Sequence, residues 1–348
     1  MKCLLSQART HIATITEHLK TGNIKPETAA EFTRLVSVLR HCTAKTLREV
    51  VKDITACTIR DVKLLLIDAM ARVGTEAAGI VLKECITEGK MAKKLHRITF
   101  GVGWVRGLDT GFMKNVLAIC QHQTVVADVK AHRGCWFSFG TLVNRLMVKM
   151  RRNPRMGQDM RLVIFRQQIV KTIKEVMKNA KDDEEKITYI KAVGNAGWIT
   201  IDIFKIVCDI INNAKTLLHV KVQAIWALRH MARVEPVLVR QKLLPILANP
   251  LVDPEIRISC YKILMQNDPS LLTCQMIGGV IAREAAGRGP RSNQFVSFVA
   301  SDLRTSINYD NIDIVKASRA RLLLRVIPRA LTFQIFSYSK AINIPIDA

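Results

Sequence analysis

The sequence predicts an all-α fold built as a solenoid of helical repeats, and three observations carry that prediction. Residues 220–228 repeat in residue class at 256–264, with Leu228 matched by Leu264. The offset of 36 residues is the length of one helix pair, which is typical of stacked helical units. Residues 62–74 align in the same way with residues 185–197, and both end in glycine. Only 5% of residues are aromatic, and Leu, Ile, Val, Ala, Lys and Arg dominate, a mixture that favours helices over strands.

Proline and glycine mark the expected helix ends. Pro26 begins a helix, and apolar residues then recur at helical spacing from Ile59 to Val73. Gly74 is expected to end that helix, while Thr75 caps the next one and Glu76 lies in its first turn. Glu235-Pro236, Asp253-Pro254 and Asp268-Pro269 predict three further helix starts, each with an acidic cap before a proline.

Other stretches are less regular. Five glycines between residues 98 and 135 predict short helices with longer loops. Asn153-Pro154 interrupts the basic segment 145–155, which we interpret as an exposed basic loop. The last helices are expected at 291–307 and 312–327, ending at Pro328. We therefore predict one solenoid over residues 1–328, followed at 329–348 by an extended tail or the start of a β-rich region.

The charge balance points to an anionic partner. Lys plus Arg number 53 against 29 Asp plus Glu, a formal net charge of +24. Such a chain favours nucleic acid, anionic head groups, sulfated sugars or acidic receptors. The candidate polyanion surface comprises Arg151, Arg152, Arg155, Lys171, Lys174, Lys178 and Lys181. The four lysines share one helical face, opposite Ile169, Ile173 and Val176, and the lack of interleaved aromatic residues makes nucleic acid the least favoured partner.

The sequence indicates neither an enzyme nor a cofactor site. Its serines and cysteines lack a nucleophile elbow or a partner base. Gly101, Gly103 and Gly107 do not have the spacing of a dinucleotide loop. His230 is interpreted as a surface or groove residue, and Arg229 and Arg233 as neighbours on a solvated helix face, one turn apart and able to meet an acidic group.

A zinc site is the one metal alternative. Cys120, His122, His132 and Cys135 have the right number and types of ligand, but their spacing is not a usual one. Loop and core roles are therefore favoured, and no metal is predicted. Most of the nine cysteines are interpreted as small core hydrophobes, with one or two disulfides possible and the redox compartment left open. No signal peptide or membrane-spanning window is found, so a secreted parent protein would imply that this chain is a fragment.

Several short blocks, in order along the chain, resemble the helical domain of the large lipid transfer proteins. This family comprises vitellogenins, apolipophorins, apolipoprotein B and the microsomal triglyceride transfer protein. The blocks are residues 68–78, 191–197, 224–232, 244–249, 254–257 and 292–299, which together extend the resemblance over roughly residues 10–327. The family-motif residues with expected structural roles are Gly74, Thr75, Glu76, Gly194, Asn195, Gly197, Trp226, Arg229, Pro245, Asn249, Pro254 and Arg257.

This resemblance implies a two-layered, right-handed α-α superhelix shaped as a horseshoe. In the family this helical domain wraps β-sheets that line a lipid cavity. The resemblance therefore also implies that the parent protein is secreted, transports lipid, and has phospholipids and neutral lipids as partners. An acidic receptor or glycosaminoglycan would account for the basic charge. One departure concerns Cys135: relatives continue the segment resembling 139–147 into a disulfide-forming cysteine, but here Met147 and Val148 follow Leu146. Cys135 is therefore expected to lack that local partner. The competing hypothesis is a free-standing helical scaffold that binds an acidic protein or nucleic acid.

Overall fold

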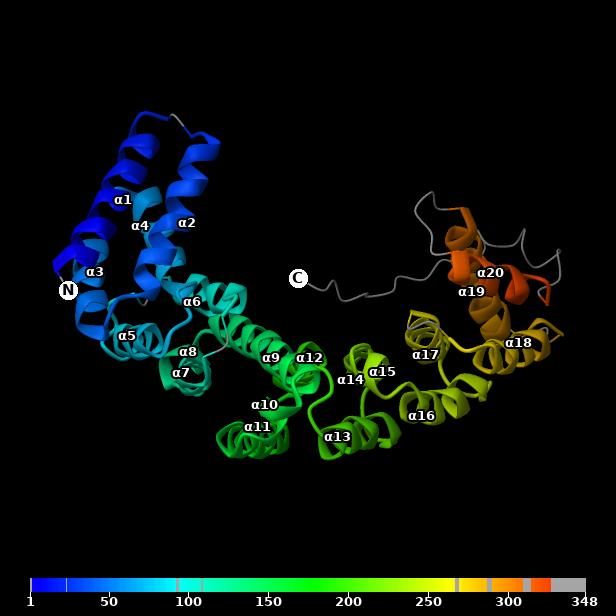
Figure 1. Ribbon diagram of the computed structural model, residues 1–348. Coiled ribbons are helices and arrows are strands. Elements are labelled where there is room, and N and C mark those ends of the chain that lie inside the picture. Colours follow the sequence, from blue (N-terminus) through cyan, green and yellow to red (C-terminus); the bar gives the residue numbers. More distant parts are fainter. Residues whose placement is uncertain are drawn as a thin grey trace. The chain divides into compact units, whose positions relative to one another are not determined.

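The computed structural model describes residues 2–22, 24–91, 94–107, 109–266, 269–286, 290–308 and 314–326. All regular elements in these ranges are helical, which confirms the all-α prediction. The chain divides into two compact units, residues 1–169 and 170–348 (Figure 1). Each is described separately, and the single solenoid over 1–328 stays a prediction.

The first unit consists of helix pairs stacked in two layers. One layer contains α1 (Lys2–Lys20), α3 (Ala44–Ala56), α5 (Glu76–Thr87) and α7 (Thr110–Cys120), each packed on the next. The other contains α2 (Pro26–Arg40), α4 (Arg60–Ala71), α6 (Leu95–Gly101) and α9 (Val129–Arg152). Shorter pieces connect them: the 3-10 helix η2 (Val102–Trp104), α8 (Gln123–Ala127) and α10 (Pro154–Gln158). Helix α11 (Met160–Lys178) contains the boundary between the units.

The second unit repeats this arrangement. In one layer α12 (Asp183–Ala196), α14 (Leu218–Ala227), α17 (Pro254–Gln266) and α19 (Pro290–Asn308) pack in succession. In the other, α16 (Pro236–Ala248), α18 (Leu271–Ala286) and α20 (Ile314–Leu324) do the same. Helix α13 (Ile201–Asn212) packs against α14, and α15 (Met231–Val234) against α16. The segments that repeat at 36 residues belong to α14 and α17, which are neighbours in one layer, so the repeat is confirmed.

The predicted helix ends are mostly confirmed. Gly74 and Gly197 both have positive φ, +76° and +69°, a backbone conformation that side chains disfavour. Pro236 and Pro254 begin α16 and α17, as predicted. Asp253 accepts a hydrogen bond from the backbone N of Glu255, at 2.7 Å, whereas the Glu235 side chain makes no cap bond. The third predicted start is displaced: Pro269 precedes α18, which begins at Leu271, and Ser270 Oγ accepts a hydrogen bond from Thr273 N at 3.2 Å. Asp268, Pro328 and the tail after it lie outside the described residues.

Two expectations about irregular segments were wrong in part. The basic segment 145–155 is helical: α9 runs to Arg152, and α10 begins at Pro154. Asn153 alone interrupts the two helices, because its side chain caps α10 and proline suits a first helical position. Gly134, expected in an irregular stretch, lies inside α9, where a Cβ would come within 2.6 Å of the Phe100 ring. Glycine is there because α6 packs closely, and not because the chain turns.

Candidate polyanion surface and motif contacts

The three basic residues at the end of α9 and in α10 are exposed. Arg151 and Arg152 belong to the last turn of α9, and Arg155 lies in the first turn of α10. Cations at the C-terminal end of a helix interact favourably with its macrodipole, which explains their place in α9. The prediction that these side chains are solvent-accessible is therefore met, although on helices instead of a loop.

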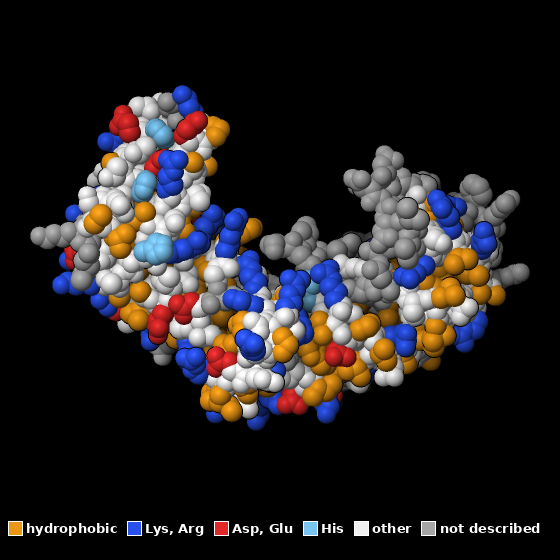
Figure 2. Space-filling view, viewed as in Figure 1, with side chains coloured by type: hydrophobic (Ala, Val, Ile, Leu, Met, Phe, Trp, Pro, Cys, Tyr) orange, Lys and Arg blue, Asp and Glu red, His pale blue; other side chains and the backbone are white. Residues whose placement is uncertain are grey.

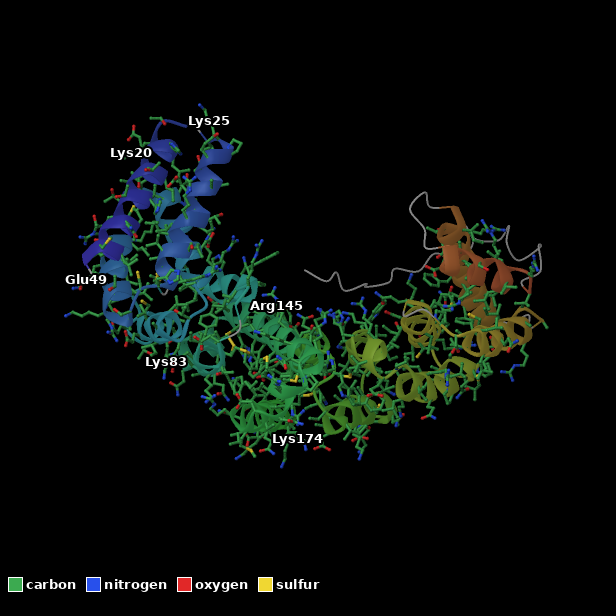
Figure 3. All side chains as sticks on the ribbon, viewed as in Figure 1. Lys20, Lys25, Glu49, Lys83, Arg145 and Lys174 are labelled. Carbon is green, nitrogen blue, oxygen red and sulfur yellow. A yellow bond between two sulfur atoms is a disulfide. The ribbon has the colours of Figure 1, made fainter. Side chains whose placement is uncertain are left out.

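The four lysines of the second cluster are also exposed, in α11 and the turn after it. Ile169 and Ile173 are buried on the opposite face, as the spacing predicted, whereas Val176 is half-buried. Lys174, labelled in Figure 3, has its Nζ 3.1 Å from Oδ2 of Asp202 in α13. Lys171 Nζ lies 4.0 Å from Glu175 Oε1. Carboxylates thus partly neutralise this face. Two carboxylates beside four exposed lysines leave the cluster with a net positive charge. Elsewhere on the molecule, Figure 2 shows further Lys and Arg side chains at the surface.

The first motif block joins α5 to α7. Thr75 Oγ1 accepts a hydrogen bond from Ala78 N at 3.3 Å, which confirms the predicted cap. Asp109, which no sequence pattern marked, accepts a hydrogen bond from Glu76 N at 2.8 Å and another from Phe112 N at 3.1 Å. One carboxylate therefore caps the N-termini of two neighbouring helices. Glycine is needed at position 74, just before this cap, since a Cβ there would lie 2.1 Å from Val105 Cγ1.

Arg229 forms the second motif contact, and the expectation that it lies on a solvated face was wrong. Its side chain is buried, and Nη2 donates to Asn195 Oδ1 at 2.6 Å while Nη1 donates to the Trp226 carbonyl at 3.2 Å. Gly194 makes room for it, because a Cβ would lie 2.6 Å from Arg229 Nη1. The blocks at 191–197 and 224–232 therefore meet between α12 and the end of α14. Arg233 is exposed and His230 half-buried.

Arg257 forms the third contact and is fully buried in α17. Its Nε donates to the Leu247 carbonyl at 2.9 Å, and its Nη1 donates to Glu284 Oε2 at 3.1 Å. Nη2 lies 3.1 Å from Glu284 Oε1 without hydrogen-bond geometry. The guanidinium also lies 4.3 Å from the centre of the Phe295 ring, a cation–π contact.

Three of the blocks noted in the sequence thus meet at one side chain, because Leu247, Arg257 and Phe295 come from the blocks at 244–249, 254–257 and 292–299. Glu284, on α18, was missed. The sequence feature that could have revealed it is a single acidic residue on the apolar face of a helix. A buried charge of this kind requires a partner.

The remaining motif residues lie at helix ends or within helices. Pro254 is buried at the first position of α17, and Pro245 is exposed inside α16. Asn249 ends α16 and accepts a hydrogen bond from Leu251 N at 3.0 Å. The buried indole Nε1 of Trp226 has no hydrogen-bond partner among the described residues. None of these positions offers a reactive group.

The cysteines and histidines considered for zinc have other roles. Cys120 and Cys135 form a disulfide, so neither is free as a thiolate ligand. His122 Nδ1 accepts from Thr124 N at 3.3 Å, and His132 Nε2 accepts from Trp136 Nε1 at 2.9 Å. The disulfide also corrects the expectation that Cys135 lacks a local partner: that partner precedes it in α7 and does not follow it in α9.

Two of the free thiols, those of Cys85 and Cys208, are buried in the core. Burial raises the pKa of Cys85 and of Cys208 to about 11. Both therefore stay protonated at neutral pH, and a protonated thiol is a poor nucleophile. They behave as the small core hydrophobes that the sequence predicted.

Comparison with known proteins decides the family. The profile described as the Vitellogenin TPR domain matches residues 6–304. The chain belongs to this family. It is 27% identical to vitellogenin-6 of Oscheius tipulae over 300 residues, which cover 84% of the chain and 18% of that protein. It is 23% identical over 357 residues to the vitellogenin of Ichthyomyzon unicuspis, covering 96% of the chain and 18% of that protein.

A solved structure supports the fold of this vitellogenin-family chain. A chain from the structure described as "Lipid-protein interactions in lipovitellin" superposes with a TM-score of 0.72 at 18% identity. The match covers 94% of this chain and 33% of the lipovitellin chain. The resemblance noted in the sequence is thereby confirmed. The chain spans about a fifth of the length of the vitellogenins it matches.

Proposed function

We propose that this chain is the helical scaffold module of a vitellogenin-like lipoprotein that transports lipid. Its role is structural and not catalytic: with β-sheet domains elsewhere in the parent protein, it encloses phospholipid and neutral lipid. The observation that carries this proposal is the family match over residues 6–304. The buried contacts of Arg229 and Arg257 support it, because motif residues that hold helices together suit a scaffold.

An apolar face on α18 also supports an association with lipid or with another domain. Leu271, Leu272 and Met276 are exposed on this helix, and hydrophobic side chains gather over it in Figure 2. Contiguous exposed apolar side chains are uncommon on isolated soluble proteins and usually mark an interaction surface. No described helix is both long and apolar enough to cross a bilayer.

Secretion of the parent protein is part of the same proposal. The Cys120–Cys135 disulfide supports it, because disulfides persist in oxidising compartments and are rare in the cytosol.

Lipid content provides the test. The full parent protein, purified under native conditions, is expected to yield phospholipid and neutral lipid on solvent extraction and mass spectrometry. Leu272→Asp with Met276→Asp should lower that lipid content, whereas Leu251→Asp, at an exposed apolar side chain in a turn, should not. A parent protein that carries no lipid would overturn the proposal.

The lysine face of α11 is proposed to contact an acidic receptor or a glycosaminoglycan. Its exposure and net positive charge support this contact. Lys171→Glu with Lys178→Glu should elute from heparin at clearly lower salt than the wild type. The matched control is Lys20→Glu with Lys25→Glu, at the α1–α2 turn labelled in Figure 3. Equal shifts for both pairs would show that only total charge matters.

A further inference from the structure

A pocket in the first unit combines an apolar floor with a basic rim. It has a volume of about 460 Å³ and lies between α3, α4 and the segment that leads into α6. The floor is formed by Ile54, Leu64, Ile67 and Met91. All of these except Leu64 are buried. The volume falls within the range of roughly 300–1,000 Å³ that is typical of small-molecule sites.

The rim carries four cations: Arg60, Lys63, Lys90 and Lys94. Lys63 Nζ donates to the Thr55 carbonyl at 3.1 Å, which holds its ammonium group beside α3. Lys90 forms an ion pair with Glu88, so one of the four charges is offset. No carboxylate is among the described residues that line the pocket, and its mouth therefore keeps a net positive charge.

A second basic pocket in the same unit shows what the floor adds. It is lined by Arg145, Lys149 and Arg152 with Asn144, Val148 and Asn153, and has a volume of about 390 Å³. Val148 is its one aliphatic side chain. Charge alone would suit inorganic anions at either place, but the first pocket offers more apolar surface for a hydrocarbon chain, supplied by four hydrophobic side chains instead of one.

From the combination of an apolar floor and a basic rim, we infer that the pocket between α3 and α4 binds a single acyl chain that ends in an anionic head group. The chain lies on the floor formed by Ile54, Leu64, Ile67 and Met91, and the head group lies at the Arg60, Lys63 and Lys94 rim. Fatty-acid carboxylates and lysophospholipid phosphates share this chemistry. The site lies within the helices themselves, so it goes beyond the proposed scaffold role and does not require the β-sheet domains.

Titration calorimetry on the 348-residue chain tests the site, with dodecanoate and lauroyl lysophosphatidate as probes below their aggregation concentrations. We expect saturable binding of one molecule per chain for at least one probe, and the stronger probe identifies the head group. Dodecanol should bind at least about tenfold more weakly, because it lacks the charge. Butyrate and inorganic phosphate should not compete, because they lack the chain.

Variants separate the rim from the floor. Arg60→Glu with Lys94→Glu should weaken binding about tenfold or more, while Lys149→Glu with Arg152→Glu, which makes the same charge change in the second pocket, should leave it within about twofold. Leu64→Trp keeps the basic rim but fills the space above the apolar floor, and it should abolish binding. Thermal melting of each variant establishes that it is folded.

Four results would overturn the inference: no stoichiometric binding of either probe, equal affinity for dodecanol, effective competition by butyrate or phosphate, or equal losses in the two charge-reversed variants. None of these four results would change the lipid content of the parent protein, which tests the scaffold role. The two proposals can therefore fail independently.

Discussion

Two arginine–carboxylate pairs join neighbouring helices in different units, and they differ in their access to water. Arg97, in α6, donates from Nε to Asp68 Oδ1 at 2.9 Å, and the two side chains are 34% and 25% exposed. Arg257 and Glu284 make a similar pair between α17 and α18, but are 0% and 7% exposed. Solvent screens the first pair, while the second is held in a low-dielectric interior. We therefore expect the loss of one partner to cost little at the first pair and much more at the second.

The largest expected effect follows from removing one member of the buried pair. Arg257→Ala should lower the free energy of unfolding by about 3–5 kcal/mol, because Glu284 would be left buried and unpaired and the Phe295 contact would be lost. Urea denaturation followed by circular dichroism measures this loss. A decrease below about 1 kcal/mol would show that water reaches Glu284 in solution.

Gly194 tests how tightly the other buried arginine is enclosed. Gly194→Ala places a Cβ 2.9 Å from Ala227 Cα and 2.6 Å from Arg229 Nη1, so we expect a loss of about 1–3 kcal/mol. The matched control is Gly279→Ala in α18, where a Cβ meets nothing within 4 Å. There the higher helix propensity of alanine should raise stability by about 1 kcal/mol. The same sign for both changes would contradict the packing described for Arg229.

Breaking the exposed pair should have a smaller effect. Arg97→Ala should lower the free energy of unfolding by only about 0.2–1 kcal/mol, since solvent already screens its contact with Asp68. The difference between this loss and that of Arg257→Ala, measured under identical urea conditions, quantifies what burial adds. Losses of equal size would remove the distinction between the two pairs.

The smallest expected effect is a pH dependence at another exposed pair. Hydrogen bonding to Arg48 holds the pKa of Glu84 below its ordinary value of 4.5. A carboxyl with a lowered folded pKa stabilises the protein above its ordinary pKa, and that contribution is lost as the pH falls through the folded pKa. Glu84→Gln should therefore lower stability slightly at neutral pH, and the difference from the wild type should shrink as the pH falls below 4.5. An unchanged acid limb would mean that the Arg48 contact is not formed in solution.

The sequence predicted the helical part of this picture well, because periodic burial and helix ends leave local signals. Gly74 and Gly197 were identified as helix ends, and both adopt the positive φ that favours glycine. The 36-residue repeat placed α14 and α17 as equivalent neighbours. These features depend on residues within one or two helices.

The contacts between repeats were harder to predict. Arg229 looks like a surface residue in its own helix, and its burial depends on the missing side chain of Gly194, 35 positions earlier. The burial of Arg257 could not be predicted from its own helix, because its partner Glu284 lies on another helix. Cys120 and Cys135 were considered together only as a disfavoured zinc site, with loop and core roles preferred, and the sequence did not pair them as a disulfide.

A pair of double-mutant cycles tests most directly whether buried motif contacts, more than exposed ion pairs, hold neighbouring repeats together. The cycles use Arg257→Met with Glu284→Met, and Arg97→Met with Asp68→Ala. We predict a coupling energy above about 2 kcal/mol for the buried pair and below about 1 kcal/mol for the exposed pair. The double variant at 257 and 284 should also be more stable than either single variant. Equal coupling energies in the two cycles would contradict the account.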